Sequence, residues 1–302
     1  MRVLLTGASG FIGGRILDAL LRDGHRVVAV SRRKPSAASE QLRFLPKDFA
    51  ESMDPADWVG AVQDIDVVIN AVGILREHGR QRFESLHHRA PVALFEAAAA
   101  SGVRRVVQVS ALGADDEAAT GYHLSKKAAD DALLGMQVEG IVVQPSVVVG
   151  QGGAATAMFT TQARLPFIPV PGSGQQCMQP IHSDDLAELV VALATNDALA
   201  NQYKGRRVAA VGPEPMSLRD FYARLRRTLG FESPARFINI PMWYMNMLAQ
   251  AGRWVPGSPL DPDTLSMLER GTLAPVDDTR AILGREPRAL ETFFEPRAGD
   301  GP

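Results

Sequence analysis

The sequence contains one cysteine, Cys177, so the chain can form neither an internal disulfide nor a metal site built from several thiolates. It has no large excess of either charge: 32 Lys and Arg stand against 34 Asp and Glu, which gives no electrostatic basis for binding nucleic acid. No run of about eighteen apolar residues could form a transmembrane helix, and the N-terminal MRVLLTGASG lacks the pattern of a signal peptide. These absences predict a reducing, cytoplasmic setting, with no bound metal and no nucleic-acid partner.

Short β-branched runs alternate with amphipathic helical patterns through the first half of the chain. The expected strands lie at 2–6, 26–31, 66–71, 105–110 and 140–149, and the helical patterns at 11–22, 89–101 and 122–136. The strand runs are apolar almost throughout, which is typical of parallel strands buried on both faces. This alternation predicts an α/β fold with a doubly wound parallel sheet of the Rossmann type.

The composition changes after Gly150, where the Pro- and Gly-rich stretch 165–180 predicts a loop. A helix from Ser183 to about Thr195, a strand at 206–212 and a helix beginning at Ser217 follow. We therefore expect a dinucleotide-binding core at 1–150 and a smaller mixed C-terminal lobe at 151–302 that covers the site. Residues 178–212 are expected to return to the core sheet.

The stretch TGASGFIGG (6–14) lies between the first expected strand and the first expected helix. At this position of a βαβ unit, glycines let backbone amides approach a pyrophosphate at the helix N-terminus. A plain tight turn with helix-packing glycines is the alternative. The candidate cofactor contacts here are Gly7, Ser9, Gly10, Phe11, Ile12 and Gly13.

The second expected strand ends at Ser31 and is followed by Arg32 and Arg33. An NAD-type site usually has an acidic residue there, which holds the ribose hydroxyls. Guanidinium groups can instead bind a 2′-phosphate through charge-assisted hydrogen bonds, which favours NADP(H) over NAD(H). The alternative is a pair of solvated charges in a loop.

Two further strand ends supply candidate cofactor contacts. In LPKDFA, Asp48 follows a third short strand, where its carboxylate could accept the adenine amino group, and Phe49 is its neighbour; an ordinary turn residue is the alternative. In NAVG (70–73), the small residues Ala71 and Gly73 flank Val72 and would allow a ligand or another backbone to approach closely.

Tyr122 and Lys126 lie four residues apart in GYHLSKKAADDALL and share one face of the expected helix. Ser110 ends the fifth expected strand, at the sheet edge where ligands of open α/β folds bind. A neighbouring lysine and a nicotinium charge would lower the pKa of the phenol. Tyr122 could then act as general acid or base toward a carbinol oxygen that Ser110 orients, while Lys126 also holds the nicotinamide ribose.

In this order, TGASGFIG, NAVG, Ser110, YHLSK and QPSVVVG resemble the motifs of short-chain dehydrogenases/reductases of the extended or atypical type. VSALGAD, QPSVVVGQGG and AAVGPEPMSLRDF are most similar to the group of the NADPH-binding accessory subunit of respiratory complex I and of bacterial NAD-dependent epimerase/dehydratase-like proteins. The resemblance implies NADP(H) binding by the residues named above, with Pro145 and Val147 as further contacts. Gln144 replaces an arginine usual in this family, and the segment before Tyr122 is short, which weakens the case for a sugar-nucleotide substrate.

These patterns favour an NADP(H)-dependent oxidoreductase that moves hydride between nicotinamide and a carbonyl or carbinol carbon of a small molecule. Two alternatives stay open. One is an NADP(H)-binding assembly or sensor protein, related to the complex I subunit or to coenzyme Q biosynthesis, that turns over nothing. The other is a nucleotide-sugar epimerase or dehydratase.

Three features outside the expected site allow a structural and a functional interpretation. The stretch PMWYMNMLAQAGRWVP (241–256) predicts core or a pocket lid, or else a face for an apolar, quinone-like substrate or a membrane surface. His182 and Asp185 could do acid–base work, but Ser183 to Asp185 is typical of a helix N-terminus. His87 and His88 lack a third partner of the kind that binds zinc.

Overall fold

The computed structural model describes residues 1–252 and 261–295, and the chain divides into two compact units. The first unit comprises Met1–Pro145, Asp184–Ala210 and Asp277–Arg285. The second comprises the described residues of Ser146–Ser183, Val211–Val276 and Glu286–Pro302. The chain therefore leaves the first unit after Pro145 and returns to it twice.

Within the described residues, the first unit contains a seven-stranded sheet in which every neighbouring pair is parallel. The order is β11-β6-β5-β4-β1-β2-β3. The strands are β1 (Arg2–Thr6), β2 (Arg26–Ser31), β3 (Leu42–Pro46), β4 (Val67–Asn70), β5 (Arg105–Val109), β6 (Glu139–Pro145) and β11 (Arg206–Ala210). The predicted doubly wound parallel sheet is confirmed.

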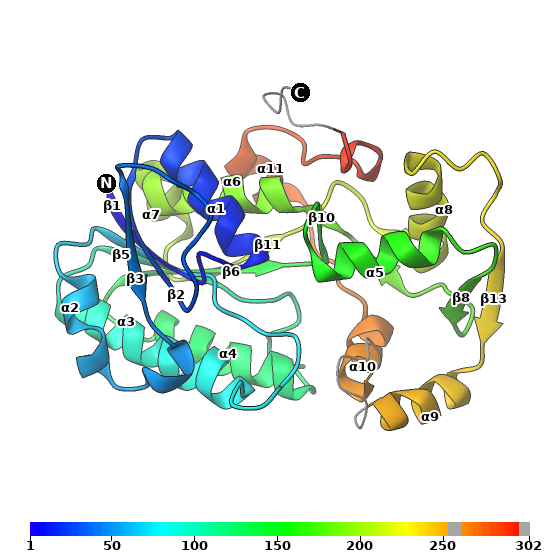
Figure 1. The fold of residues 1–302 in the computed structure, drawn as a ribbon, viewed down its shortest axis with the longest axis horizontal. Coiled ribbons are helices and arrows are strands. Elements are labelled where there is room, and N and C mark those ends of the chain that lie inside the picture. The colour runs from blue at the N-terminus through cyan, green and yellow to red at the C-terminus, as the bar shows by residue number, and fades with distance from the viewer. Residues whose placement is uncertain (253–260, 296–302) are drawn as a thin grey trace. The chain divides into compact units, whose positions relative to one another are not determined.

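Helices cover both faces of this sheet (Figure 1). On one face lie α2 (Val59–Val62), α3 (Ala90–Ala100) and α4 (Gly121–Leu134); on the other lie α1 (Phe11–Arg22), α6 (Ser183–Thr195) and α7 (Asp197–Tyr203). Helix α11 (Asp277–Leu283) packs beside β11. Short helical turns η1 (Phe49–Glu51), η2 (Pro55–Asp57) and η3 (Glu84–Arg89) join these elements.

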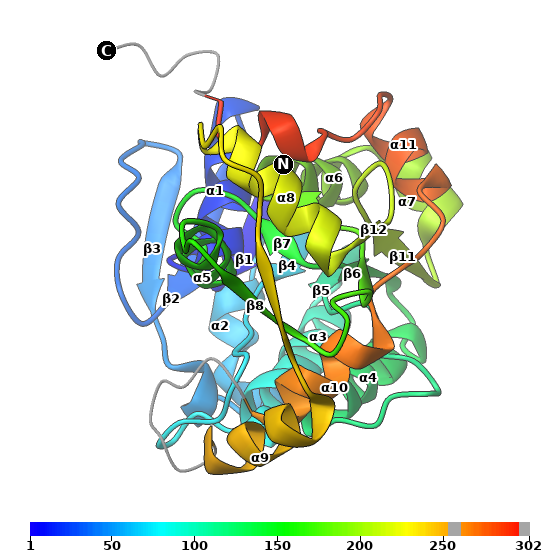
Figure 2. The ribbon, with the colours of Figure 1, turned by 90° about the vertical axis from the view of Figure 1, so that its right-hand side faces the viewer.

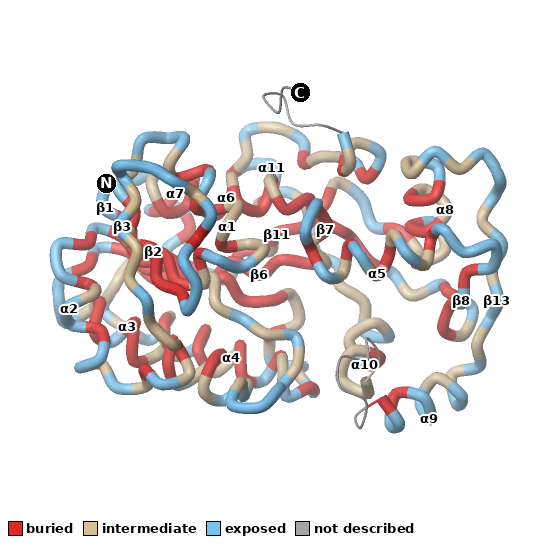
Figure 3. The backbone as a smooth tube through the Cα atoms, in the orientation of Figure 1, coloured by how far each residue is buried: buried red, intermediate tan, exposed pale blue. Residues whose placement is uncertain are grey.

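Burial along the strands follows their place in the sheet. The central strands β4 and β5 are buried at every residue, because helices cover both of their faces. In Figure 3 the buried stretches of this unit, drawn in red, gather between its helices. Strand β3 has no fully buried residue and lies at the edge of the sheet beside β2, as seen in Figure 2. The apolar runs in the sequence therefore mark the interior strands most clearly.

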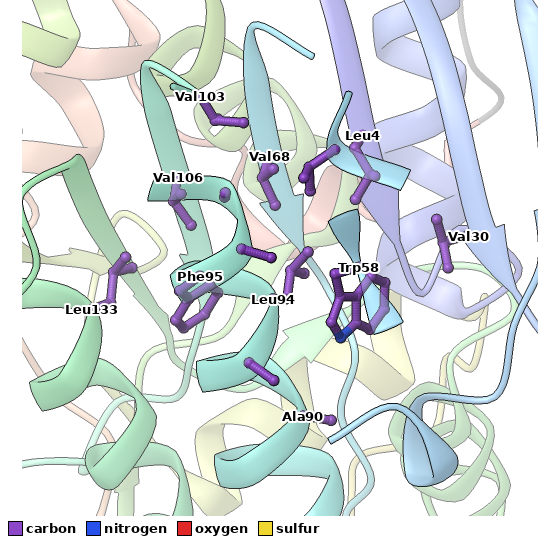
Figure 4. Packing of buried hydrophobic residues seen from close by; sticks show 14 of the residues in the cluster. Leu4, Val30, Trp58, Val68, Ala90, Leu94, Phe95, Val103, Val106 and Leu133 are labelled. Carbon is purple, nitrogen blue, oxygen red and sulfur yellow. The ribbon is translucent and has the colours of Figure 1, made fainter. Parts of the chain in front are cut away.

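The main core of the first unit fills the space between the sheet and α3 (Figure 4). Trp58 and Phe95 are fully buried there, and the Trp58 Nε1 donates a hydrogen bond to the Ser52 carbonyl at 3.0 Å. Sheet residues Leu4, Val68 and Val106 meet helix residues Leu94 and Leu133 in the same cluster. This layer carries the strand ends on which the candidate site is built.

The second unit has its own core, between α5 (Ala154–Ala163) and α8 (Leu218–Thr228). Phe159 meets Phe221 edge-to-face at 4.9 Å between ring centres. Its other elements are β7 (Val148–Val149), β8 (Ile168–Pro171), β9 (Cys177–Met178), β10 (Ile181–His182), β12 (Met216–Ser217), β13 (Phe237–Ile240), α9 (Met242–Gly252), α10 (Pro262–Arg270) and η4 (Leu290–Thr292).

Two local predictions were wrong. The expected strand 140–149 is two strands, β6 and β7, because Pro145 has no N–H with which to continue the ladder. The stretch 165–180 is not all loop: β8 pairs with β13, and β9 with β12. In the stretch 241–256, expected to be core or a pocket lid, Trp243 and Met247 are 70% and 52% exposed, so these two side chains are not core; residues 253–256 of that stretch lie outside the described residues.

We expect Arg105→Met to lower the free energy of unfolding by about 2–4 kcal/mol, because a buried ion pair is broken. The Arg105 side chain is 1% exposed, donates to Glu139 at 2.9 Å and to the Ala194 carbonyl at 2.8 Å, and joins β5 to β6 and α6. The measurement is urea denaturation. The matched control is Arg104→Met, which removes a more exposed partner of Asp197 and should cost less than about 1 kcal/mol. Equal costs would contradict this account.

Candidate functional site

The glycine turn after β1 lies where the strand order reverses, between β1 and β4. Ligands of open α/β sheets bind at such a switch point, beyond the carboxyl ends of the strands. Gly7 has a φ of +73°, and a Cβ there would be 2.7 Å from the Ala71 carbonyl oxygen. A Cβ on Gly13 would be 2.1 Å from the Gly7 oxygen. Gly7 therefore lets the turn lie against the loop that follows β4, and Gly13 lets the first turn of α1 lie against Gly7.

This turn presents the N-terminus of α1 without a side-chain cap. Gly10 is the N-cap residue and offers no capping oxygen, so the first-turn amides stay available to an anionic ligand. Ser9 and Gly10 are exposed, whereas Phe11 and Ile12 are half-buried. The uncapped helix end fits a dinucleotide pyrophosphate.

Arg32 and Arg33, which follow β2, are exposed, and a hydrogen bond within their turn stabilises it. Ser31 Oγ donates a hydrogen bond to the Arg33 carbonyl at 2.7 Å. With the Gln81 amide oriented so that its oxygen faces Arg32, that oxygen accepts from the two terminal guanidinium nitrogens at 2.6 and 2.7 Å. Gln81 comes from the loop between β4 and η3, and no pattern in the sequence pointed to it.

Asp48 and Phe49 both have structural roles. One carboxylate oxygen of Asp48 accepts a hydrogen bond from the Ala50 amide at 3.0 Å and caps η1. Phe49 is buried and meets Trp58 edge-to-face at 5.1 Å between ring centres. Asp48 thus caps a turn with one carboxylate oxygen, and Phe49 belongs to the core; the contact of these residues with adenine stays a prediction.

A buried chain of polar side chains crosses the carboxyl ends of three neighbouring strands. Thr6 Oγ1 donates to Asn70 Oδ1 at 2.5 Å, and Asn70 Nδ2 donates to Gln108 Oε1 at 2.7 Å. The Val72 amide also donates to Asn70 Oδ1, at 3.2 Å. This chain fixes the loop Ala71–Gly73. Polar residues near the ends of apolar strands were its signal in the sequence.

Helix α4 brings the predicted pair to the same edge. Thr120 Oγ1 accepts from the His123 amide and begins the helix, and Tyr122, Lys126 and Asp130 follow along one face. The Lys126 ammonium is buried and donates to the Val109 carbonyl at 3.0 Å and to the Val72 carbonyl at 3.4 Å. A Cβ on Gly73 would be 3.1 Å from Lys126 Nζ. Lys126 therefore joins the helix to the ends of β4 and β5.

Burial sets the ionisation of these three groups. It lowers the pKa of Lys126 to about 8, against the charge of Asp130, and it raises the pKa of Asp130 to about 7. The expected lowering of the Tyr122 pKa is not found in the chain alone: burial, followed by the charge of Asp130, raises it to about 12. Tyr122 is therefore a protonated donor at neutral pH.

His87, which the sequence offered only as a poor zinc ligand, lies inside this site. Its Nε2 accepts from the Ile74 amide at 3.0 Å, so the ring proton is on Nδ1 and donates to Ser125 Oγ at 3.1 Å. Ser125 Oγ in turn donates to the Tyr122 carbonyl. Burial, aided by the charge of Lys126, lowers the pKa of His87 to about 2, so the ring is neutral. His87 links the loop after β4 to α4.

Ser110 has a partner that the sequence did not indicate. Its Oγ donates to Asp130 Oδ2 at 2.5 Å, and both residues are buried. Nearby, the Gln144 amide donates to the Ala114 carbonyl at 2.9 Å. No sequence motif pointed to Asp130, because an aspartate on a helix is usually exposed to solvent.

The remaining predicted residues are distributed over both units. Pro145 ends β6, and its carbonyl accepts from the Leu112 amide at 2.9 Å. Val147 belongs to the second unit, where its carbonyl accepts from the Ile181 amide at 3.0 Å. Asp185 is buried and pairs with Arg285 at 2.8 Å, and the His182 ring lies against Phe293.

The sequence model described as the NAD dependent epimerase/dehydratase family matches residues 3–204. The chain is 28% identical over 198 residues to ceramide reductase of Caulobacter vibrioides, covering 65% of this chain and 62% of that protein. It is 25% identical over 247 residues to the mitochondrial NADH dehydrogenase (ubiquinone) 1 alpha subcomplex subunit 9 of Arabidopsis thaliana, covering 78% and 59%. The expected resemblance is confirmed. The chain spans less than two thirds of each relative.

Among solved structures, UDP-glucuronic acid 4-epimerase from Bacillus cereus, in complex with UDP-glucuronic acid and NAD, has a TM-score of 0.71 to this chain. It is 18% identical, and the match covers 97% of this chain and 96% of that one. This likeness shows the fold. Among residues 1–252 and 261–295, no helix has the length and apolar character needed to cross a membrane.

Gly7→Ala should destabilise the chain by about 1–3 kcal/mol more than Gly24→Ala, because only the first places a methyl group against backbone. Both glycines have similar positive φ values, and nothing lies within 4 Å of a Cβ on Gly24. The cost of left-handed backbone, about 1–2 kcal/mol, is therefore common to both variants. Chemical denaturation gives the difference, and equal destabilisation would contradict the close approach of the turn to Ala71.

Proposed function

The chain belongs to the NAD dependent epimerase/dehydratase family, and we propose that within it the chain is an NADP(H)-dependent oxidoreductase acting on a carbonyl or carbinol carbon. The observation that carries this proposal is that Tyr122 and Lys126 lie on the same face of α4. The buried Lys126 ammonium donates hydrogen bonds to backbone carbonyls at the ends of β4 and β5. The relative named ceramide reductase supports a reductive reaction.

The residues fit a nicotinamide dinucleotide, which when bound would supply or accept the hydride. The uncapped start of α1 would bind the pyrophosphate, and Arg32 and Arg33 would bind a 2′-phosphate. Lys126, whose ammonium lies at the strand ends, would hold the nicotinamide ribose. The loop Ala71–Gly73 stays close to this ammonium because Gly73 has no side chain.

The protonation states favour Tyr122 as the acid. With its pKa raised to about 12, Tyr122 keeps its proton at neutral pH and can give it to an oxygen that becomes negative as its carbon is reduced. His87 and Ser125 fix the backbone of Tyr122, and the His87 ring stays neutral at neutral pH because burial lowers its pKa to about 2. We propose an apolar substrate, in keeping with the lipid named in the relative ceramide reductase.

A second candidate is a protein that binds NADP(H) without turning over a substrate. The likeness to a mitochondrial complex I subunit favours it, and so does the high pKa of Tyr122, which makes the phenol a weak acid. The other alternative, a nucleotide-sugar epimerase or dehydratase, is supported only by a likeness of fold to solved structures.

Arg32→Ala and Arg33→Ala should each weaken NADPH binding by about 10- to 100-fold, since a hydrogen bond to a charged group contributes about 1.5–3 kcal/mol. NADH, which lacks the 2′-phosphate, should bind the variants and the wild type with similar affinity. Fluorescence titration measures both. Lys34→Ala, an exposed cation in the same loop, is the control and should leave the NADPH preference in place. A wild-type preference for NADH would overturn the role of the arginines.

Tyr122→Phe should lower kcat for carbonyl reduction by about 10²- to 10⁴-fold, because it removes the proton donor and keeps the ring. The NADPH dissociation constant should change little. The measurement is NADPH oxidation across a panel of ketones and aldehydes, under saturating cofactor. Tight NADPH binding without turnover of any carbonyl by the wild type would favour the binding-protein alternative.

A further inference from the structure

Asp130 continues the face of α4 that carries Tyr122 and Lys126, one turn beyond the lysine, and its side chain is fully buried. Ser110 Oγ donates to its Oδ2 at 2.5 Å. The other oxygen, Oδ1, has no hydrogen-bond partner among the residues that the structure describes. A buried carboxylate with one unpaired oxygen is costly, whereas a neutral carboxyl in the same place costs much less.

Charged groups reach Asp130 from several elements. Lys126 lies one turn away on α4, and Arg207 approaches from β11, where it pairs with the neighbouring Asp131. Burial raises the pKa of Asp130 and is the largest effect on it. The Ser110 hydroxyl, the two cations and, least strongly, the Gln144 amide of β6 lower this pKa but do not offset burial. The raised value, about 7, lies in the range where a proton can come and go at physiological pH.

The proton on Asp130 determines the direction of its hydrogen bond with Ser110. An ionised carboxylate only accepts, so the Ser110 hydrogen points at Oδ2 and the Ser110 oxygen has only lone pairs to offer elsewhere. A protonated carboxyl can donate to Ser110 Oγ instead. The serine hydrogen is then free to be donated to another group.

We propose that Asp130 is a positioning residue whose proton decides whether Ser110 offers the substrate a hydrogen-bond donor or an acceptor. With Asp130 protonated, Ser110 donates to a carbonyl oxygen; with Asp130 ionised, Ser110 accepts from a carbinol hydroxyl. This inference rests on the proposed carbonyl and carbinol chemistry at Tyr122.

The same proton acts on Tyr122. The negative charge of Asp130 raises the pKa of the phenol, so a neutral Asp130 leaves Tyr122 a stronger acid. Protonation of Asp130 therefore favours both hydrogen bonds that carbonyl reduction needs. Reduction is fastest at a pH below the titration of Asp130, and oxidation of the carbinol at a pH above it.

The first test measures stability of the whole chain as a function of pH, for the wild type and Asp130→Asn. The pKa of Asp130 in the folded chain is raised above its ordinary 3.8. The stabilisation from its bound proton is therefore complete below about pH 4 and is lost progressively as the pH rises to about 7. Over that window the unfolding constant of the wild type should rise relative to Asp130→Asn by up to tenfold per pH unit.

Asp131→Asn is the matched control, because Asp131 is the adjacent carboxylate but is exposed and paired with Lys127. Its hydrogen bonds and the nearby cations lower its pKa despite the cost of burial, so its contribution has the opposite sign and is lost as the pH falls. A wild-type chain with no loss of stability relative to Asp130→Asn between pH 4 and 7 would overturn the proposal.

The second test needs no folded Asp130→Asn variant. Infrared titration of wild-type protein with ¹³C-labelled aspartate should show the C=O stretch of one protonated carboxyl that disappears near pH 7. In Ser110→Ala, this band should persist to higher pH, because the ionised form has lost its hydrogen bond. Titration of every aspartate in the ordinary acidic range, or no response to Ser110→Ala, would contradict the pairing.

The third test joins the pair to the reaction, using acetophenone with NADPH and 1-phenylethanol with NADP⁺. The wild-type pH profile of kcat/KM for reduction should fall across the Asp130 titration, and Asp130→Asn should lose that step, because its amide does not titrate. A step that survives in Asp130→Asn would overturn the role of Asp130 toward substrate. Absence of turnover by the wild type would count against the proposed function, while the stability and infrared results would still decide the state of Asp130.

Discussion

A buried ammonium group at the carboxyl edge of the sheet sets the conditions for the rest of the site. Lys126 Nζ donates to the carbonyls of Val109 and Val72, and so fixes α4 against the ends of two strands. Gly73 leaves room for this ammonium, since a Cβ there would lie 3.1 Å from Lys126 Nζ. When Asp130, one turn further along the helix, is ionised, its charge favours the ammonium form of Lys126.

That arrangement places two buried ionisable groups, Lys126 and Asp130, on one face of α4. Lys126 and Asp130 both titrate close to neutral pH because burial opposes the charge of each and their mutual attraction favours it. Their ionisation is thus sensitive to a bound ligand or to a small change in pH. The other end of the sheet is built for stability instead, with Arg105 bonded to a carboxylate and a backbone carbonyl.

The fold class was predictable because apolar strand runs and a glycine turn are local patterns in the sequence. The shared helix face of Tyr122 and Lys126 was predictable from their spacing of four residues. Contacts between distant segments were not. Asp130 and His87 are polar residues on helices, and nothing in the sequence shows that one meets Ser110 and the other the loop after β4. The cap that Asp48 provides for η1 was also not singled out from the sequence. In the chain alone, burial and then the charge of Asp130 raise the pKa of Tyr122. The lowering expected from Lys126 and a nicotinium charge together stays a prediction.

The central claim is that this edge of the sheet transfers hydride between nicotinamide and a carbonyl carbon. The most direct measurement supplies the protein with NADPH deuterated on the transferring face of nicotinamide C4, together with a carbonyl mixture, and follows the products by mass spectrometry. The account predicts a carbinol that carries deuterium on its former carbonyl carbon. Saturated NADPH binding, with the deuterium retained on the cofactor, would contradict it.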